Sequence, residues 1–187
     1  MISDLTIAEQ VDTLQEYYDR VYNLQSDAHT PEYMLVHDEI REKLKYCASY
    51  TELGVNQGAT LAIAVLENIK TIRAYDIALG PYNKAKKLFD VYAEEQNINL
   101  IVQESDTLAI TLGEVDLLYI DTRHTHDHLT KELRLHGDKA RKYIVFHDTH
   151  AQQGLKRAVQ EYVASHKEWS IVTDCQQHVG FMTIARG

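Results

Sequence analysis

Apolar residues recur along the chain with two spacings, one typical of helices and one typical of strands. Near the N-terminus they follow one another at steps of four and three residues, which predicts an amphipathic helix over Thr6–Leu24. Thr6 and Glu9 fit a capping box at its start. Thr30 followed by Pro31 predicts a second helix that runs to about Lys45. The positions that define the first helix face are Ile7, Val11, Leu14, Tyr18 and Val21.

From residue 46 onward, short β-prone runs alternate with longer helical patterns. This alternation predicts an α/β fold in which crossover helices cover a parallel sheet. Too few residues separate the last two runs for a crossover helix, so we expect these strands to form an antiparallel hairpin. The predicted strands are Tyr46–Leu53, Thr71–Asp76, Asn99–Val102, Val115–Asp121, Tyr143–His147, Ser170–Thr173 and Val179–Ala185, and the predicted helices between them are Ala59–Ile69, Asn83–Gln96, Thr125–Leu135 and Gln152–His166.

The composition is that of an ordinary globular protein. The 187 residues are 44% hydrophobic and 25% charged, which excludes disordered, collagen-like and coiled-coil classes. This length suffices for one domain with a full core. We divide the chain into a helical extension, residues 1–45, and an α/β domain, residues 46–187.

Charge and cysteine content narrow the classes of partner. The formal net charge is −9 and no dense basic patch is present, so we expect no nucleic-acid partner. No apolar run approaches the roughly 18 residues of a membrane span, and the N-terminal residues lack the features of a signal peptide. Cys47 and Cys175 lie far apart and form no C-x-x-C pair, which favours free thiols. We therefore expect a cytoplasmic protein without a membrane partner.

The residues that follow the predicted strands are mostly acidic or polar, and ligand sites in open parallel sheets form at these strand ends. Gly54 and Gly58 would let the backbone approach a ligand, although a strand end and a helix start explain them as well. Asp76 follows the second strand, where a carboxylate can bind both hydroxyls of a ribose. Glu52 argues against a pyrophosphate and for a ligand with an amino group or a sulfonium.

Five sequence features carry a family resemblance. They are E-x-G-x-x-x-G-x-T at Glu52 to Thr60, the acid Asp76, and the segments IDTRHTHDHL, YIVFHDTH and GLKRAVQEYV. Together they resemble class I S-adenosylmethionine-dependent methyltransferases. More narrowly, they look like the metal-dependent O-methyltransferase branch that includes catechol and macrolide-sugar enzymes and the cephalosporin-hydroxylase-like proteins. The resemblance covers about residues 46–186 and implies a Rossmann-like seven-stranded sheet of order 3-2-1-4-5-7-6 with strand seven antiparallel.

The resemblance also implies where the cofactor S-adenosylmethionine binds. Its methionine part would lie on the first turn, its ribose at the second strand end, and its adenine near the third. The residues implied are, in that order, Glu52, Gly54 and Gly58, then Asp76, then Ser105 or Asp106.

A second group of residues follows the fourth and fifth strands. Adjacent strands would bring Asp121, His147 and Asp148 within a few ångströms, which is costly unless a cation sits among the carboxylates. In the resembling enzymes these positions bind magnesium, which holds the acceptor hydroxyl beside the methyl group. His147 departs from the acids and amides found there, and nitrogen suits magnesium poorly. Manganese, iron or zinc are therefore alternatives, as is a site made by Asp121 and Asp148 alone.

His124 occupies the place where the resembling enzymes carry a general base. An imidazole with a pKa of about 6.5 can take a proton from a hydroxyl acidified by a metal. Capping of the following helix is the alternative role. We interpret His126, His128 and His136 as surface or packing residues. Four tyrosines are interpreted as packing residues or parts of an acceptor pocket: Tyr33, Tyr46, Tyr50 and Tyr75.

These features predict a metal-assisted O-methyltransferase that acts on a hydroxyl of a small molecule or sugar. The N-terminal helices would cover the acceptor site or form a homodimer, because their apolar stripe must be buried. Two alternatives stay open. Asp121, His124 and His147 would make a two-histidine, one-carboxylate centre of a non-haem iron oxygenase, or the fold would serve as a non-catalytic nucleoside-binding module.

Overall fold

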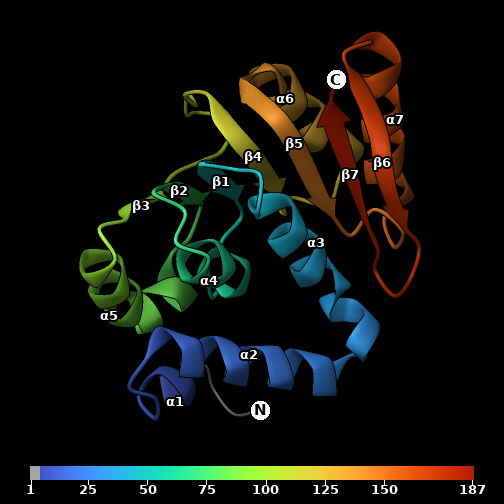
Figure 1. The fold of residues 1–187 in the computed structure, drawn as a ribbon. Helices are drawn as coiled ribbons and strands as arrows, with labels where there is room; N and C mark the ends of the chain where they lie inside the picture. The colour runs from blue at the N-terminus through green and yellow to red at the C-terminus, as the bar shows by residue number, and fades with distance from the viewer. Residues whose placement is uncertain (1–4) are drawn as a thin grey trace.

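The computed structural model describes residues 5–187, with side chains from Ile7 onward, as a seven-stranded sheet between helices (Figure 1). The first four residues of the predicted extension, and the Thr6 side chain predicted to cap it, lie outside the described part. The strands are β1 (Ser49–Leu53), β2 (Thr71–Asp76), β3 (Asn99–Glu104), β4 (Val115–Ile120), β5 (Ala140–His147), β6 (Trp169–Cys175) and β7 (Phe181–Arg186). The helices are α1 (Leu5–Ala8), α2 (Leu14–Ala28), the 3₁₀ turn η1 (Pro31–Met34), α3 (Leu35–Leu44), α4 (Ala59–Leu66), α5 (Gly80–Glu95), α6 (His126–His136), the 3₁₀ turn η2 (Gly137–Lys139) and α7 (Gln153–Ser165).

The strand order is β3-β2-β1-β4-β5-β7-β6, which confirms the predicted topology. Strands β3, β2, β1, β4 and β5 pair in parallel, whereas β7 runs antiparallel to both β5 and β6. The order reverses between β1 and β4, and the crevice at such a reversal is where open α/β sheets bind ligands.

Each face of the sheet has its own hydrophobic core. Leu117 and Tyr119 of β4 pack in the core that includes α2, α3, α4 and α5, whereas Leu118 and Ile120 pack in the core that includes α6 and α7. Successive side chains of a strand point to opposite faces, so this alternation follows from the pleat. The central strands are apolar on both faces for this reason.

The N-terminal extension departs from the predicted helix. The expected helix over Thr6–Leu24 is interrupted, with α1 ending at Ala8 and α2 beginning at Leu14. The Thr13 hydroxyl accepts from the Glu16 N–H at 3.2 Å, and the Glu16 carboxylate accepts from the Thr13 N–H at 3.3 Å. This reciprocal capping box starts the longer helix, because T-x-x-E occurs again at Thr13.

The second predicted helix and the first strand also shift at their junction. The segment after Thr30 begins as the 3₁₀ turn η1 before α3. The predicted strand from Tyr46 begins only at Ser49. The N–H groups of Tyr46 and Cys47 bind the carbonyls of Lys43 and Leu44, so they close the last turn of α3 instead of pairing in the sheet.

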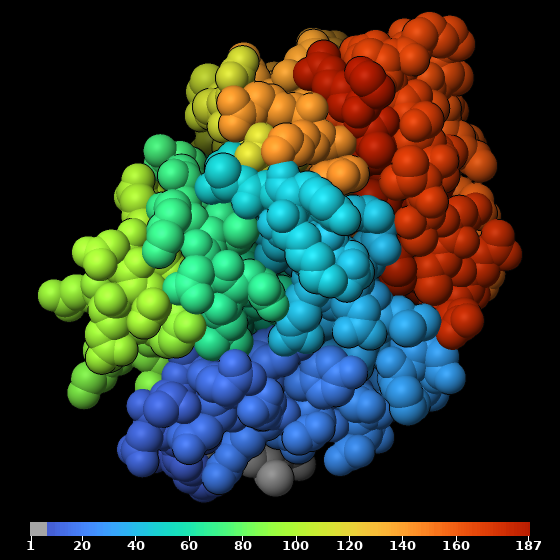
Figure 2. Space-filling view, viewed as in Figure 1, coloured from blue at the N-terminus to red at the C-terminus, as the bar shows by residue number. Residues whose placement is uncertain are grey.

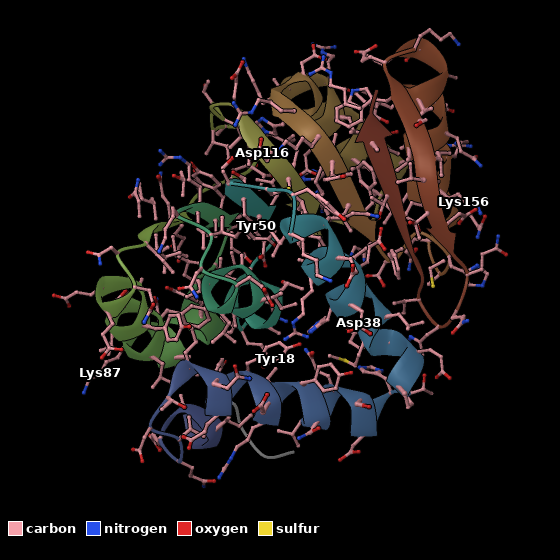
Figure 3. The ribbon with its side chains drawn as sticks, viewed as in Figure 1. Tyr18, Asp38, Tyr50, Lys87, Asp116 and Lys156 are labelled. Atoms are coloured by element: carbon pink, nitrogen blue, oxygen red, sulfur yellow. The ribbon has the colours of Figure 1, made fainter. Side chains whose placement is uncertain are left out.

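The apolar stripe of α2 is buried within this chain. Tyr17 and Val21 are at most 2% exposed and join the core beneath α4. The Tyr18 hydroxyl lies 3.0 Å from Nδ1 of the buried His37, which ties α2 to α3 (Figure 3). In the space-filling view the extension forms one continuous surface with the rest of the chain (Figure 2). Contact between two copies through these helices stays a prediction.

The described helices also bear on the membrane expectation. Among residues 5–187, no helix combines the length and the apolar character that crossing a bilayer requires.

We expect Thr13→Ala to lower the free energy of unfolding by about 1 kcal/mol, because the substitution leaves an N–H of the first turn of α2 without its cap. Urea unfolding monitored by circular dichroism measures this loss. Ser26→Ala, near the other end of α2, is the matched control and should change stability by less than about 0.5 kcal/mol. Equal stabilities of the two variants would contradict the assigned helix start.

Candidate functional site

The turn after β1 lies against the end of β4. Gly54 has a φ of +90°, and a Cβ at this position would lie 1.9 Å from the carbonyl oxygen of Asp121. The Asp121 N–H donates to the Leu53 carbonyl at 2.8 Å, so the two strand ends are held together here. Glycine is therefore required for both the backbone conformation and the close approach.

Gly58 has a different reason to be glycine. It precedes α4 with a φ of +84°, and a Cβ there would lie 3.0 Å from Cζ of Phe89 and 3.3 Å from Cδ2 of Tyr82. Its small size lets α4 pack on α5. Gly58 does not border either cavity described below, unlike Gly54.

Asp76 holds the glycine turn in shape. Its Oδ2 accepts hydrogen bonds from the N–H groups of Val55 at 2.6 Å and Asn56 at 2.9 Å, and its Oδ1 accepts from the Ala78 N–H at 3.0 Å. A carboxylate has about four acceptor positions, so the side chain retains capacity for a ligand hydroxyl. Asp76 also borders both cavities of the site.

Glu52 supports the turn from within the core. Its side chain is fully buried, and it accepts hydrogen bonds from the hydroxyls of Tyr50 at 2.7 Å and Thr60 at 2.6 Å. Burial raises the pKa of Glu52 to about 8, although both hydroxyls act to lower it. Tyr50 belongs to β1 (Figure 3). Glu52 borders neither cavity, and its hydrogen bonds place it behind the turn.

A cleft of about 580 Å³ lies over the ends of β1, β2, β3 and β4. Asp106 borders it, whereas Ser105 does not and instead donates its N–H to the Asp76 carbonyl at 2.7 Å. The volume is in the range of pockets that bind cofactors and drug-sized ligands. The lining residues are Gly54, Asp76, Ile77, Asp106, Thr107, Leu108, Asp121, Thr122, Arg123 and His128.

A smaller cavity, of about 100 Å³, continues on the other side of the turn. It shares Gly54, Asp76 and Asp121 with the cleft, so the two spaces meet at the glycine turn. The N-terminal extension contributes Gln25, Tyr33, Val36 and His37 to its wall. Oε1 of Gln25 is buried and makes no hydrogen bond with the described residues.

Four side chains, which we call the His–Asp centre, gather where β4 and β5 end: Asp121, His124, His147 and Asp148. Nε2 of His124 lies 3.2 Å from Oδ1 of Asp121 and 3.0 Å from Oδ2 of Asp148. Nδ1 of the buried His147 lies 3.5 Å from Oδ2 of Asp121 and 3.6 Å from Oδ1 of Asp148. Each carboxylate therefore faces both imidazoles, one oxygen to each ring.

The opposite charges of the His–Asp centre stabilise one another. Hydrogen bonds to Asp121 and Asp148 raise the pKa of His124. Burial lowers the pKa of His147, but the two carboxylates outweigh it and raise that pKa above its ordinary value. Burial likewise works against the ionised carboxylates, yet the imidazoles lower the pKa of both Asp121 and Asp148. Protons on the histidines thus supply the positive charge that two adjacent carboxylates need.

Aromatic rings cover the His–Asp centre. The ring of Tyr33 lies edge-on to His147 with centroids 5.6 Å apart, and burial raises the Tyr33 pKa to about 12. His29 stacks on Tyr33 at 4.4 Å, and His178 from the β6–β7 loop packs edge-on against Tyr33 at 5.2 Å. The centre is therefore covered by the segment before α3 and by the terminal hairpin.

The His–Asp centre fits a divalent cation. Asp121, His124 and Asp148 each offer one donor atom, and these three atoms lie within 4.8 Å of one another. The buried Nδ1 of His147 makes no hydrogen bond with the described chain, so it too has an unused lone pair or proton at this point. Two carboxylates and a nitrogen suit manganese, iron or zinc better than magnesium. The three residues whose donor atoms lie close together include His124, which the sequence suggested as a general base. They do not include His147, which the sequence suggested as a metal ligand.

The site also contains residues that the sequence did not single out. His128 borders the cleft and also packs against the buried Glu132, with Nε2 3.1 Å from its Oε1. His126 does lie on the surface, 2.8 Å from Glu161, and His136 is buried. Further additions include Gln25, His37, Ile77, Thr107 and Leu108. Of these residues, only Ile77 could have been recognised from the sequence, because it is an apolar residue directly after the acid that ends the second strand. In the structure it is 75% exposed.

Comparisons with known proteins identify the fold. No protein-family model matches the chain. No curated protein matches it either. Among solved structures, a candidate caffeoyl-CoA O-methyltransferase from Staphylococcus aureus has 13% identity and a TM-score of 0.63, covering 82% of this chain and 83% of its own. The O-methyltransferase from Bacillus cereus in complex with SAH has 14% identity and a TM-score of 0.60, and the match covers 95% of this chain and 92% of that protein.

A methylase of ribosomal protein L11 from Lactobacillus delbrueckii subsp. bulgaricus has 16% identity and a TM-score of 0.56, covering 85% of this chain and 78% of its own. At such identities the likeness concerns the fold. These neighbours act on different substrates by name, so the fold alone does not select an acceptor. The chain has the class I methyltransferase fold that its motifs predicted.

The buried Glu52 predicts a pH-dependent stability. Its folded-state pKa of about 8 lies above the ordinary value of 4.5, so the fold favours the protonated acid. That contribution is fully present below pH 4.5 and is lost as the pH rises through about 8. We expect Glu52→Gln to gain stability over the wild type across this window, by up to about 1.4 kcal/mol per pH unit.

Urea unfolding of both proteins at several pH values in the window measures the difference. Glu94→Gln, at an exposed position of α5, is the control and should follow the wild-type curve. A difference between Glu52→Gln and wild type that does not change with pH would contradict a protonated, buried Glu52.

Proposed function

We propose that the protein is an S-adenosylmethionine-dependent methyltransferase that methylates a hydroxyl group with the assistance of a divalent metal. The observation that carries the proposal is that the cleft and the smaller cavity meet at Gly54 and Asp121. A cofactor lying along the cleft would therefore end beside the His–Asp centre.

The cleft has the features that an adenosyl group requires. Asp76 has spare acceptor positions for ribose hydroxyls in the middle of the cleft. Ile77 and Arg123 offer an exposed aliphatic surface and a planar guanidinium for a flat nucleobase. The smaller cavity would receive the methionine part, where the buried Oε1 of Gln25 can accept from an ammonium group.

The His–Asp centre would receive the acceptor hydroxyl. Asp121 and Asp148 would hold a divalent cation, with Nε2 of His124 as a third donor. A bound cation would supply Lewis-acid chemistry that lowers the pKa of the hydroxyl. Tyr33, His29 and His178 would exclude water from one side of the reacting atoms.

Methyl transfer from a sulfonium needs alignment more than acid–base power. The C–S bond breaks as the C–O bond forms in line with it, and the charge on sulfur disappears. The glycine turn and the end of β4 fix the two partners on a rigid sheet edge, because Gly54 and Asp121 are in direct backbone contact. This rigidity favours a geometric mechanism.

The geometry favours His124 as a ligand over the general base suggested by the sequence. Nε2 of His124 faces both carboxylates, at 3.2 Å from Asp121 and 3.0 Å from Asp148. A cation between Asp121 and Asp148 would meet the same nitrogen. The composition of the donor set weighs against the iron-oxygenase alternative. The three donor atoms that lie close together come from Asp121, His124 and Asp148, and His147 is not among them. A non-catalytic nucleoside-binding module remains as an outcome of the following test.

Isothermal titration of the purified protein with S-adenosylhomocysteine, alone and with Mn²⁺, tests the function. We expect a one-to-one complex, and methyl transfer from S-adenosylmethionine to members of a panel of catechol and sugar hydroxyls only when the metal is present. Failure to bind S-adenosylhomocysteine under either condition would refute the proposal. Binding without transfer to any hydroxyl would favour the nucleoside-binding module.

We expect His124→Ala to weaken Mn²⁺ binding at least about 10-fold and to remove turnover, while S-adenosylhomocysteine still binds. Calorimetry with the metal and with the nucleoside separates these effects. His126→Ala, two residues further on and outside the His–Asp centre, is the matched control and should retain both affinities. Lost turnover with unchanged Mn²⁺ affinity would return His124 to the role of general base.

A further inference from the structure

A buried carboxylate on α6 takes no part in the chemistry proposed above. Glu132 is 0% exposed. Its Oε1 accepts from the Thr107 hydroxyl at 2.6 Å and faces Nε2 of His128 at 3.1 Å, and its Oε2 accepts from the Thr122 hydroxyl at 2.8 Å. Burying a carboxylate is costly unless donors surround it, so these three partners are what allows Glu132 to lie in the core.

All three partners of Glu132 border the cleft. Thr107 follows β3, Thr122 follows β4, and His128 lies one turn before Glu132 on the same face of α6. His136, one turn further on, places Nε2 2.8 Å from the Thr107 carbonyl. One face of α6 therefore holds both the loop after β3 and the loop after β4 where they border the cleft.

The hydrogen bond to Glu132 determines what the His128 ring can offer a ligand. A carboxylate oxygen has no proton to donate, so Nε2 of His128 is the donor in this pair. In a neutral imidazole the other nitrogen, Nδ1, is then an acceptor. Nδ1 makes no hydrogen bond with the described residues. The ring thus lines the cleft with one acceptor left for a bound molecule.

We propose that His128 is a specificity-determining residue for the nucleobase and that Glu132 is the positioning residue that fixes its ring. This inference rests on the proposed function. Adenine carries an exocyclic amino group as a donor at C6, and a 6-oxo purine carries a carbonyl acceptor in its place. An acceptor nitrogen on the wall of the cleft can accept a hydrogen bond from the amino group of adenine. Beside a 6-oxo purine the same nitrogen faces a second acceptor, so the site selects adenosyl over inosyl ligands.

The test compares S-adenosylhomocysteine with S-inosylhomocysteine, its 6-oxo analogue, by calorimetry. We expect the wild type to prefer the adenosyl compound. His128→Leu should weaken adenosyl binding about 10-fold, the loss of one hydrogen bond to the ligand, and bring the ratio of the two affinities close to one. Lys131→Ala, exposed on the same helix, is the matched control and should keep the wild-type ratio.

Glu132→Gln tests the positioning role, because it keeps the size of the side chain but offers one acceptor oxygen to three donors. Glu132→Gln should lower the ratio of the affinity for S-adenosylhomocysteine to that for S-inosylhomocysteine. Thermal unfolding should show that the variant is folded. His128→Leu keeps the proposal testable if that variant does not fold, since the His128 side chain is 16% exposed and Glu132 keeps the hydroxyls of Thr107 and Thr122 as donors.

The outcomes separate the two proposals. A wild type that binds neither compound would refute the proposed function, and this inference with it. A wild type that prefers the adenosyl compound, together with a His128→Leu variant that keeps the full preference, would overturn the role of His128 and leave the function standing.

Discussion

The backbone contact between Gly54 and Asp121 is the constraint on which the site depends. The turn after β1 reaches the end of β4 so closely that no side chain fits between them. This contact lies at the reversal of strand order, where the cleft and the smaller cavity meet. Because both spaces share this point, whatever binds along the cleft is directed to the residues that follow β4.

The His–Asp centre shows how a fold maintains like charges close together. Asp121 and Asp148 end adjacent strands, and the parallel pairing of β4 with β5 holds them side by side. His124 and His147 face both carboxylates and favour their ionised forms. The arrangement is balanced by protons or by a cation, and both would occupy the same space between the side chains.

Segments outside the strand-end motifs complete the site. The N-terminal extension buries its apolar stripe against α4 and supplies Gln25, Tyr33 and His37 to the smaller cavity. On the opposite face of the sheet, α6 holds the loops after β3 and β4 through Glu132. The rigid edge of the sheet thus provides the common points, while helices from both faces determine which molecules fit around them.

The sequence by itself determined the α/β class, the topology and the strand ends that carry Asp76, Asp106, Asp121 and Asp148. The class and the strand ends follow from hydrophobic periodicity along the chain, whereas the strand order was implied by the family resemblance that the motifs carry. The break between α1 and α2 was missed because Thr6 and Thr13 both begin a T-x-x-E pattern, and only packing selects one as the start of the longer helix.

Tertiary structure alone decided that Glu52 lies behind the turn, that His124 joins the two carboxylates, and that His128 borders the cleft. A side chain's direction depends on neighbours distant in sequence, such as Thr60 for Glu52 or Thr107 for Glu132. Local patterns predict which residues end a strand, but which of them face a ligand is determined by contacts that form only when the chain has folded.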